Sequence, residues 1–184
     1  MSITQELYRA VAVEDPDGRW ELHRGKLREK PAMSFVHNEV MVELGYQLRA
    51  QLPPDAFVVR INAGRLSLGE DSYYIPDVLV MARPSGAPVS MQIAALETYG
   101  EPALLVAEVW SPSTGEYDVE GKLPRYQKRG DLEIWRIHPI DRRVDVWERL
   151  PGGVYQHKTF TEGVSAPRAL PGVHIDLETL FAHV

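Results

Sequence analysis

Hydrophobic residues follow a helical spacing near the start of the chain and a strand spacing through much of the rest. Four apolar residues that recur every fourth position predict a helix with one buried stripe: Val36, Val40, Leu44 and Leu48. Ser34 is suited to cap this helix, and Pro53-Pro54 ends it near Leu52. The segment from Ala103 to Trp110 is almost purely apolar, which predicts a strand buried on both faces.

The order of the expected elements indicates the fold class. The other expected elements are a helix at 4–13, a hairpin at 20–30, strands at 57–62, 65–68 and 73–82, a helix at 118–129, strands at 132–138, 144–150 and 154–160, and a short helix at 176–181. Pro76 interrupts one strand, Pro124 lies inside one helix, and 83–102 is irregular except for one helical turn at 91–99. This order predicts an α/β (α+β) fold, a mixed central sheet flanked by helices with extra C-terminal strands.

Length and composition predict a single domain over residues 1–184. The chain has no cysteine, so oxygen atoms or imidazole nitrogen must hold any metal. The first residues lack the apolar stretch of a signal peptide, and no later stretch is long enough for a membrane helix. We therefore expect a cytoplasmic protein with no membrane partner. The net charge of −6 argues against non-specific coating of nucleic acid.

Two acidic residues break the hydrophobic pattern in the same way. Asp77 lies among the apolar residues of 73–81, and Glu108 lies among those of 103–110. A lone buried carboxylate costs several kcal/mol or more, so each must be paired, protonated or bound to a metal. One interpretation places each acid at a strand end, solvated or paired with an arginine. Because both acids are expected on neighbouring strands, a shared site for Mg²⁺ or Mn²⁺ is the alternative that the pattern favours.

Two further groups of polar residues are candidates for accessory roles. Asp118 and Lys122 are spaced i, i+4, which is typical of a surface ion pair, although the lysine could instead point back over the carboxylates. His37 stands beside Val36 on the first long helix and is either a partly buried histidine or part of a site. Arg125, Lys128 and Arg129 form a basic cluster that could contact nucleic-acid phosphates or simply face solvent.

Several runs of the sequence resemble the Uma2 family of restriction endonucleases, within the PD-(D/E)xK nuclease superfamily. The most specific run is Leu104-Leu-Val-Ala-Glu-Val-Trp-Ser-Pro-Ser-Thr114. Tyr74-Ile-Pro-Asp-Val-Leu-Val80 precedes it, and Tyr117-Asp118, Lys122, Tyr126 and Gly130 follow it. Shorter matches extend the likeness over most of the chain: Trp20-Glu-Leu-His-Arg-Gly25, Ile134-Trp-Arg-Ile-His-Pro139 and Leu170-Pro-Gly-Val173.

The resemblance implies a restriction-endonuclease-like core and a set of site residues. By position it makes Asp77 and Glu108 the metal ligands, with the Val109 backbone carbonyl as a third ligand. The superfamily places a lysine two residues after the second acid, where this chain has Trp110. The Uma2-like pattern places the lysine on the following helix, at Lys122.

Three functions are therefore compatible with the sequence. The first is a metal-dependent DNA endonuclease that hydrolyses phosphodiester bonds, with Lys122 assisting the metal. The second is a catalytically inactive nuclease-like module that binds nucleic acid or protein. The third is a structural part of an oligomer, in which the acids form internal ion pairs. Cutting both strands of a duplex favours a homo-oligomer, a dimer or a higher assembly.

Overall fold

The structure is a computed structural model that describes residues 2–83, 96–112 and 116–184. Two helices begin where the sequence predicts. Helix α1 (Gln5–Glu14) is capped by the Thr4 side chain, and helix α2 (Phe35–Gln51) is capped by the Ser34 hydroxyl, which accepts from the His37 amide. Among the described residues, no helix is long and apolar enough to cross a membrane.

The stripe expected on α2 is present, shifted slightly toward the C-terminal end of the helix. Val40, Leu44 and Leu48 are fully buried, whereas Val36 is only half-buried because it lies in the first turn. Gly45 allows close packing, since a Cβ at this position would lie 2.3 Å from Cδ1 of Ile61. The helix therefore packs tightly onto the strand that follows it.

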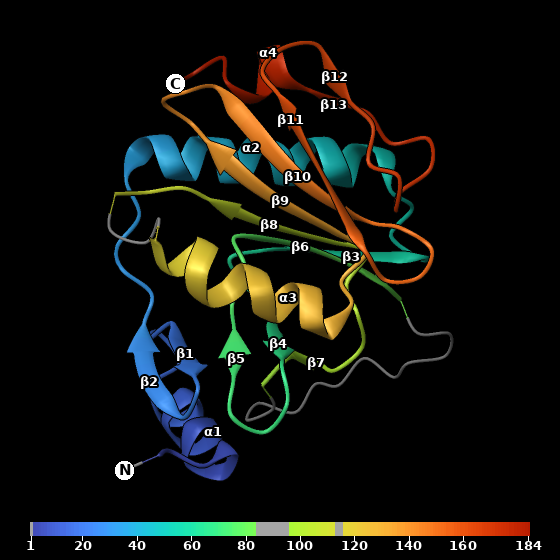
Figure 1. Ribbon diagram of the computed structural model, residues 1–184. Coiled ribbons are helices and arrows are strands. Elements are labelled where there is room, and N and C mark those ends of the chain that lie inside the picture. Colours follow the sequence, from blue (N-terminus) through green and yellow to red (C-terminus); the bar gives the residue numbers. More distant parts are fainter. Residues whose placement is uncertain (1, 84–95, 113–115) are drawn as a thin grey trace.

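A small sheet is formed mainly by the N-terminal part of the chain, in the order β2-β1-β5-β4-β7. Its strands are β1 (Trp20–His23), β2 (Lys26–Glu29), β4 (Arg65–Ser67), β5 (Tyr73–Tyr74) and β7 (Thr98–Tyr99). The β1–β2 hairpin turns at Arg24 and Gly25, whose φ angles of 50° and 71° suit a two-residue turn. Helix α1 packs against this sheet, as Figure 1 shows at the bottom of the molecule.

The larger central sheet has six strands in the order β11-β10-β9-β8-β6-β3. Its strands are β3 (Phe57–Ile61), β6 (Val78–Ala82), β8 (Leu105–Val109), β9 (Glu133–His138), β10 (Arg143–Arg149) and β11 (Tyr155–Phe160). Only β8 and β9 pair in parallel within this sheet, so the sheet is mixed, as predicted. The predicted fold class is confirmed.

Alternating side chains of the central strands build two separate core layers. Val78 and Val80 pack in the layer that contains α2, while Leu79 and Met81 pack in the layer that contains Tyr126. The first layer also contains residues of the C-terminal helix α4 (Leu177–Leu180), and Tyr126 belongs to α3 (Leu123–Arg129). Figure 1 shows α2 and α3 on opposite faces of the sheet. Because strand side chains alternate, Glu108 points to the α3 face when Ala107 and Val109 point to α2.

Three expectations about local structure are corrected. The predicted strand 73–82 is wrong, because β5 and β6 belong to different sheets and the chain crosses between them at 75–77. The predicted helix 118–129 is a π-helix, η1 (Tyr117–Lys122), followed by α3, with Pro124 in the first turn of α3. The predicted helical turn at 91–99 is wrong at its end, which is strand β7, and residues 91–95 lie outside the described residues.

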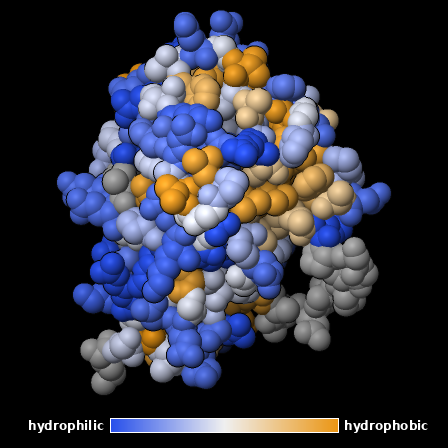
Figure 2. Space-filling view, turned by 45° about the vertical axis from the view of Figure 1, so that its right-hand side comes forward, coloured by the Kyte–Doolittle hydropathy of each residue, from blue (hydrophilic) through white to orange (hydrophobic). Residues whose placement is uncertain are grey.

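The C-terminal helix matches its prediction more closely, although the two short strands before it were not predicted by position. Strands β12 (Val164–Ser165) and β13 (Ile175–Asp176) form a two-stranded sheet. Asp176 then caps α4 through bonds from the amides of Glu178 and Thr179. The face in Figure 2 is largely hydrophilic, with its hydrophobic side chains gathered in patches, as expected for a fold that buries two core layers.

Candidate functional site

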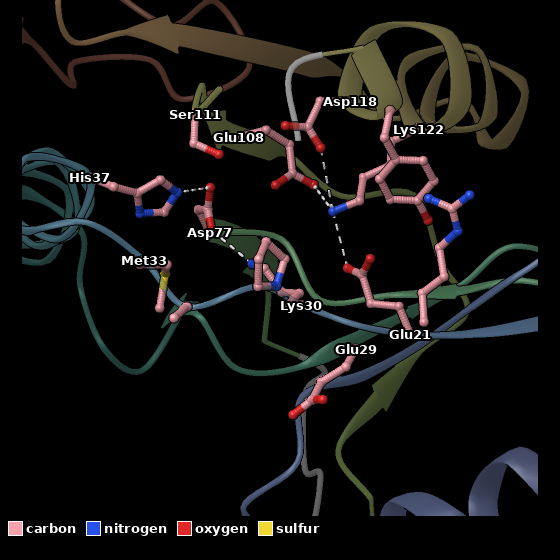
Figure 3. A pocket seen from close by; sticks show the side chains of 14 residues that line it. Glu21, Glu29, Lys30, Met33, His37, Asp77, Glu108, Ser111, Asp118 and Lys122 are labelled. Atoms are coloured by element: carbon pink, nitrogen blue, oxygen red, sulfur yellow. Dashed lines mark hydrogen bonds and ion pairs between the residues drawn. The ribbon is translucent and has the colours of Figure 1, made fainter. Parts of the chain in front are cut away.

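A cavity of about 340 Å³ lies where the small sheet meets the central sheet. It is lined by fourteen residues, among which are the two acids singled out from the sequence, Asp77 and Glu108. Asp77 is brought there by the crossing from β5 to β6, and Glu108 by its position near the end of β8. Both acids are buried, with 2% and 5% of their surface exposed. The structure therefore places the two predicted acids in one cavity (Figure 3).

Asp77 is held by three donors from different elements. Its Oδ1 accepts from Lys30 Nζ at 2.7 Å, and its Oδ2 lies 3.0 Å from His37 Nε2 and accepts from the Val109 amide at 2.8 Å. Burial opposes ionisation of Asp77, but the charges and hydrogen bonds of Lys30 and His37 outweigh it and hold the pKa of this carboxyl well below its usual range. Asp77 is therefore a carboxylate over the whole physiological range.

Glu108 has fewer positive charges and hydrogen-bond donors around it than Asp77 has. Its Oε1 accepts from Tyr126 OH at 2.6 Å and from Lys122 Nζ at 3.1 Å. Burial, together with the nearby charges of Asp77 and Asp118, outweighs Lys122 and raises the pKa of Glu108 to about 8. The two acids thus differ in protonation at neutral pH, although they share a cavity.

Lys122 lies among three carboxylates. Besides Glu108, its Nζ lies 3.1 Å from Glu21 Oε1 and 3.7 Å from Asp118 Oδ1, as Figure 3 shows. Burial opposes the positive charge, but the carboxylates, Glu108 first, raise the pKa of Lys122 well above its usual value. Lys122 and Asp118 are 2% and 6% exposed, so the interpretation as a surface ion pair is wrong. The i, i+4 spacing is real, but this side of η1 faces the cavity.

The position where the superfamily carries its lysine is occupied here by a residue that turns away from the site. Trp110 stacks on His138 of the neighbouring strand β9, with ring centroids 5.9 Å apart. The amino group that meets Glu108 comes instead from η1. Such π-helical turns, which hold one residue more per hydrogen-bonded loop than an α-helix, are frequent at functional sites. The structure thus places Lys122 in contact with Glu108.

The basic residues of α3 have separate environments. Arg129 donates to Asp131 through Nε and Nη2, and both side chains are buried, so this arginine stabilises the fold. Arg125 makes only long contacts of 3.4 and 3.5 Å with the half-exposed Asp71, and Lys128 is exposed. The expected cluster of three phosphate-binding residues is therefore not one continuous surface.

Three residues that line the cavity or contact one of its acids were missed as candidates in the sequence. Lys30 stands beside Pro31, where no spacing rule marks it, and it reaches Asp77 only in three dimensions. Glu21 alternates with Trp20 and Leu22 on a short strand, so its pattern is that of a solvent-facing residue. Tyr126 belongs to the resemblance motif, but nothing in its spacing indicates the hydrogen bond that it donates to Glu108.

The donor set agrees in kind with a hard divalent cation, because carboxylate oxygens are the ligands that Mg²⁺ prefers. Within the described residues, no three His, Asp or Glu side chains are already arranged around one metal position. The ammonium groups of Lys30 and Lys122 contact the two acids instead. Mg²⁺ commonly takes one or two carboxylates and completes its shell with water and substrate phosphate, so Asp77 and Glu108 are sufficient protein ligands in number.

Comparisons with known proteins give the fold and the family of the chain. A solved structure from Anabaena variabilis, described as "a putative nuclease", superposes with a TM-score of 0.71 and 19% sequence identity over 89% of each chain, which shows a shared fold. No functionally curated protein matches the chain. The model of the Uma2 family, described as "Putative restriction endonuclease", matches residues 4–178, so the chain belongs to the Uma2 family.

Proposed function

We propose that the protein is a metal-dependent endonuclease that hydrolyses phosphodiester bonds of DNA, with Asp77 and Glu108 as its metal ligands. The observation that carries the proposal is the meeting of these two acids and Lys122 in one cavity of a Uma2-family chain. Internal ion pairs alone pack most favourably inside a core, whereas these pairs line a cavity with room for a phosphate and several waters.

In this proposal Asp77 and Glu108 hold Mg²⁺ or Mn²⁺, and the bound ion supplies a polarised phosphate and a water of lowered pKa. The chain's own residues orient the reaction. Lys30 and His37 keep Asp77 ionised and fixed in position. Tyr126 fixes the Glu108 carboxyl group, and Lys122 supplies a positive charge for the charge that grows on the phosphate. The Val109 amide already donates to Asp77, and its backbone carbonyl is proposed as a further ligand.

A second candidate function is a module that binds DNA without cutting it. The observation that favours it is that a lysine ammonium group contacts each acid: Lys30 contacts Asp77 and Lys122 contacts Glu108. If the ammonium groups outcompete a divalent ion, the cavity binds phosphate but does not hydrolyse it. Cleavage of supercoiled plasmid, with Mn²⁺ or with EDTA, distinguishes the two functions.

The test uses isosteric variants, because they remove charge without leaving a void. We expect Asp77→Asn and Glu108→Gln to lose most Mn²⁺ binding in calorimetry and most plasmid cleavage. Glu39→Gln on α2, outside the cavity lining, is the matched control and should behave as wild type. Equal Mn²⁺ affinity in all four proteins contradicts the metal site.

Lys122 is tested with an arginine in its place, because alanine would leave three buried carboxylates without their cation. Breaking such a buried network costs about 3–5 kcal/mol, so Lys122→Ala should melt at a lower temperature. Lys122→Arg retains the charge but displaces it, so we expect a folded protein with a cleavage rate lower by about 10²-fold. A wild-type rate in Lys122→Arg would show that the position of this charge does not matter.

We further propose that the protein acts as a homo-oligomer. Three exposed hydrophobic side chains lie 0, 7 and 11 residues along α2, which places them on one side of the helix: Phe35, Val42 and Tyr46. Such a row is suited to a symmetric contact that would bring two sites to the two strands of a duplex. Light scattering should give a mass larger than one chain of 20.8 kDa, and Val42→Glu should return it to that value. A wild-type mass of one chain contradicts this part of the proposal.

A further inference from the structure

The β1–β2 hairpin has a polar face and an apolar face, fixed by its register. Leu22 and Leu27 are cross-strand partners on the apolar face, where Leu22 packs with Tyr8 of α1. Glu21 and Arg28 are partners on the opposite face, because strand side chains alternate. Since Glu21 meets Lys122 in the cavity, the polar face of the hairpin is the face that borders the candidate site.

Arg28 is an exposed cation at the edge of this cavity. It lines the cavity together with Asp77, Glu108 and Lys122, and its guanidinium carbon lies 4.5 Å from the centre of the Tyr117 ring. Among the residues that the structure describes, no carboxylate forms an ion pair with it. A guanidinium placed on an aromatic ring keeps its planar edge of N–H donors available, and this edge matches the oxygens of a phosphate.

A second hollow adjoins the cavity at the same two residues. Arg28 and Tyr117 line both, and the second hollow, also of about 340 Å³, is lined in addition by His23, Arg24, Glu116, Glu120 and Gly121. Arg24 is exposed at the hairpin turn. Arg125 of α3 lines neither hollow, and its guanidinium makes long contacts with Asp71. Cations therefore continue from the cavity edge along the hairpin, although two glutamates lie among them.

Three arginines act electrostatically on His23 of strand β1. Burial lowers the pKa of His23, and the charges of Arg24, Arg28 and Arg125 lower it further, against one opposing contribution from Asp71. Three guanidinium groups thus act on one imidazole that lines the second hollow. The whole chain has a net charge of −6, but at His23 the charges of Arg24, Arg28 and Arg125 outweigh that of Asp71.

We propose that Arg24, Arg28 and Arg125, named here the arginine rim, bind phosphates of the DNA strand next to the phosphate that enters the acid cavity. The inference rests on the proposed function for the identity of its ligand. Arg28 is the central contact, because it alone of the three lines both hollows. The rim replaces the expected α3 cluster, of which only Arg125 is retained. Its positive charge compensates the repulsion between DNA and the carboxylates of the cavity.

The competing explanation is protection of an edge strand. Strand β2 is the outer strand of the small sheet, and proteins place charged side chains on such edges to prevent pairing with other chains. In that case Arg28 has no ligand, and its removal changes aggregation but not DNA affinity. The two explanations therefore differ in a measurable property.

The test is DNA binding without cleavage, measured by fluorescence anisotropy on a labelled duplex in EDTA across a series of salt concentrations. We expect the slope of log K against log salt to fall by about 1 for each arginine that no longer binds a phosphate. The slope should be smaller by about 1 in Arg28→Ala. It should be smaller by about 3 in the triple variant Arg24→Ala, Arg28→Ala, Arg125→Ala. Arg28→Lys keeps the charge but not the planar fork, so it should bind with intermediate affinity. Arg9→Ala, an exposed arginine of α1 outside both hollows, is the matched control.

Thermal melts confirm that each variant is folded, which is expected because all three arginines have no strong ion pair within the described part of the chain. Slopes equal to that of Arg9→Ala in all rim variants overturn the inference, as does a wild-type protein that binds no duplex. Weakened binding in the rim variants of a protein that never cuts DNA supports the rim and contradicts the nuclease. Cleavage that depends on Asp77, with unchanged binding in the rim variants, supports the nuclease and contradicts the rim.

Discussion

The pKa values of the two buried acids in the cavity shift in opposite directions because their neighbours differ. Asp77 receives a lysine, an imidazole and a backbone amide, whereas Glu108 receives one lysine that it shares with Glu21 and one neutral hydroxyl. An amide and a full positive charge favour an ionised acid, while burial with shared compensation favours a protonated one. A metal that binds both acids must therefore displace a proton from Glu108 but not from Asp77.

This difference predicts a pH dependence of metal binding. The ordinary pKa of a glutamate is 4.5, and burial raises that of Glu108 to about 8, so the folded protein keeps this proton between those values while the unfolded chain does not. The stability that Glu108 contributes is complete below the lower value and is lost as pH rises through about 8. Mn²⁺ affinity should show the opposite trend, rising with pH and levelling above about 8, because the ion requires the ionised acid.

Calorimetry in two buffers of different ionisation enthalpy should find about one proton released per ion below that pH. Glu108→Gln should lose the proton release along with most of the affinity. Proton release that is unchanged in Glu108→Gln would assign it to another group and contradict the raised pKa of Glu108.

At the residue scale the sequence was informative where polar residues break an apolar pattern. Asp77 and Glu108 stand out for that reason, and the structure brings them to one cavity. Lys30 and Glu21 could not be found in this way, because each lies in a local sequence where a charged residue is ordinary. Both residues act through contacts that are distant in the sequence. Lys30 contacts Asp77, which lies 47 positions away, and Glu21 accepts from the Ile75 amide, which lies 54 positions away.

At the scale of elements, the cavity is built by two irregular joints. The first is the crossing at 75–77, where Pro76 cannot donate to a strand and the chain leaves one sheet for the other. The second is the π-helix η1, which runs directly into α3 and carries Lys122 as its last residue. Strands β5 and β6 flank the first joint, and α3 continues directly from the second, so both joints are tied to regular elements.

The hairpin adds a third element through Glu21, which we predict to be a positioning residue for Lys122. Its Oε1 accepts from the Ile75 amide at 2.8 Å and lies 3.1 Å from Lys122 Nζ. Glu21→Gln keeps an acceptor for the amide but removes the charge that holds Lys122. We expect a folded protein whose kcat falls by about 10- to 100-fold with little change in DNA affinity.

The comparison variant is Glu21→Ala, which also leaves the Ile75 amide unpaired and should lose about 1–3 kcal/mol of stability, seen in urea denaturation. A split between the two variants, with activity reduced in both but stability reduced only in Glu21→Ala, is the signature of positioning. A wild-type kcat in Glu21→Gln would leave Glu21 with a purely structural role.

Elements were predicted well where one periodicity holds over a whole segment. Helix α2 and strand β8 have uniform patterns and capping or breaking residues at their ends, so their bounds agree with the structure to within two residues. The segment 73–82 has one continuous apolar pattern but serves two sheets, and no local signal gives the partner of a strand. The π-helix was missed because its residues differ from an α-helix in hydrogen bonding and not in composition.

At the scale of the whole molecule, two sheets and their helices meet around the cavity, and we propose that residues 1–184 form one domain. Besides the cavity, a second junction joins the sheets. Arg129 donates to the Tyr99 carbonyl in the small sheet and to Asp131, whose Oδ1 also accepts from the Ala103 amide just before β8. Tyr155 of β11 donates to the Asp131 carbonyl, so four segments share this junction.

Arg129→Ala therefore tests the junction and the role of this arginine together. Removing one partner of a buried ion pair costs about 3–5 kcal/mol, whereas Lys128→Ala on the exposed side of α3 should change stability by less than about 0.5 kcal/mol. Urea denaturation followed by fluorescence and by circular dichroism should give one coincident transition in each protein. Two separate transitions in wild type contradict the single domain, and an unchanged stability in Arg129→Ala contradicts the junction.

The crossing at 75–77 makes the proposed activity conditional on complete folding. Asp77 stands between a strand of one sheet and a strand of the other, and its partners come from a hairpin end, a helix and a distant strand. In a growing chain Lys122 is made only after Asp77 and Glu108, and β9, the strand beside β8, follows later still. A chain made through Glu108 but not yet through β9, or a partly unfolded chain, thus carries both acids but has no assembled site, so it would not cut the DNA around it.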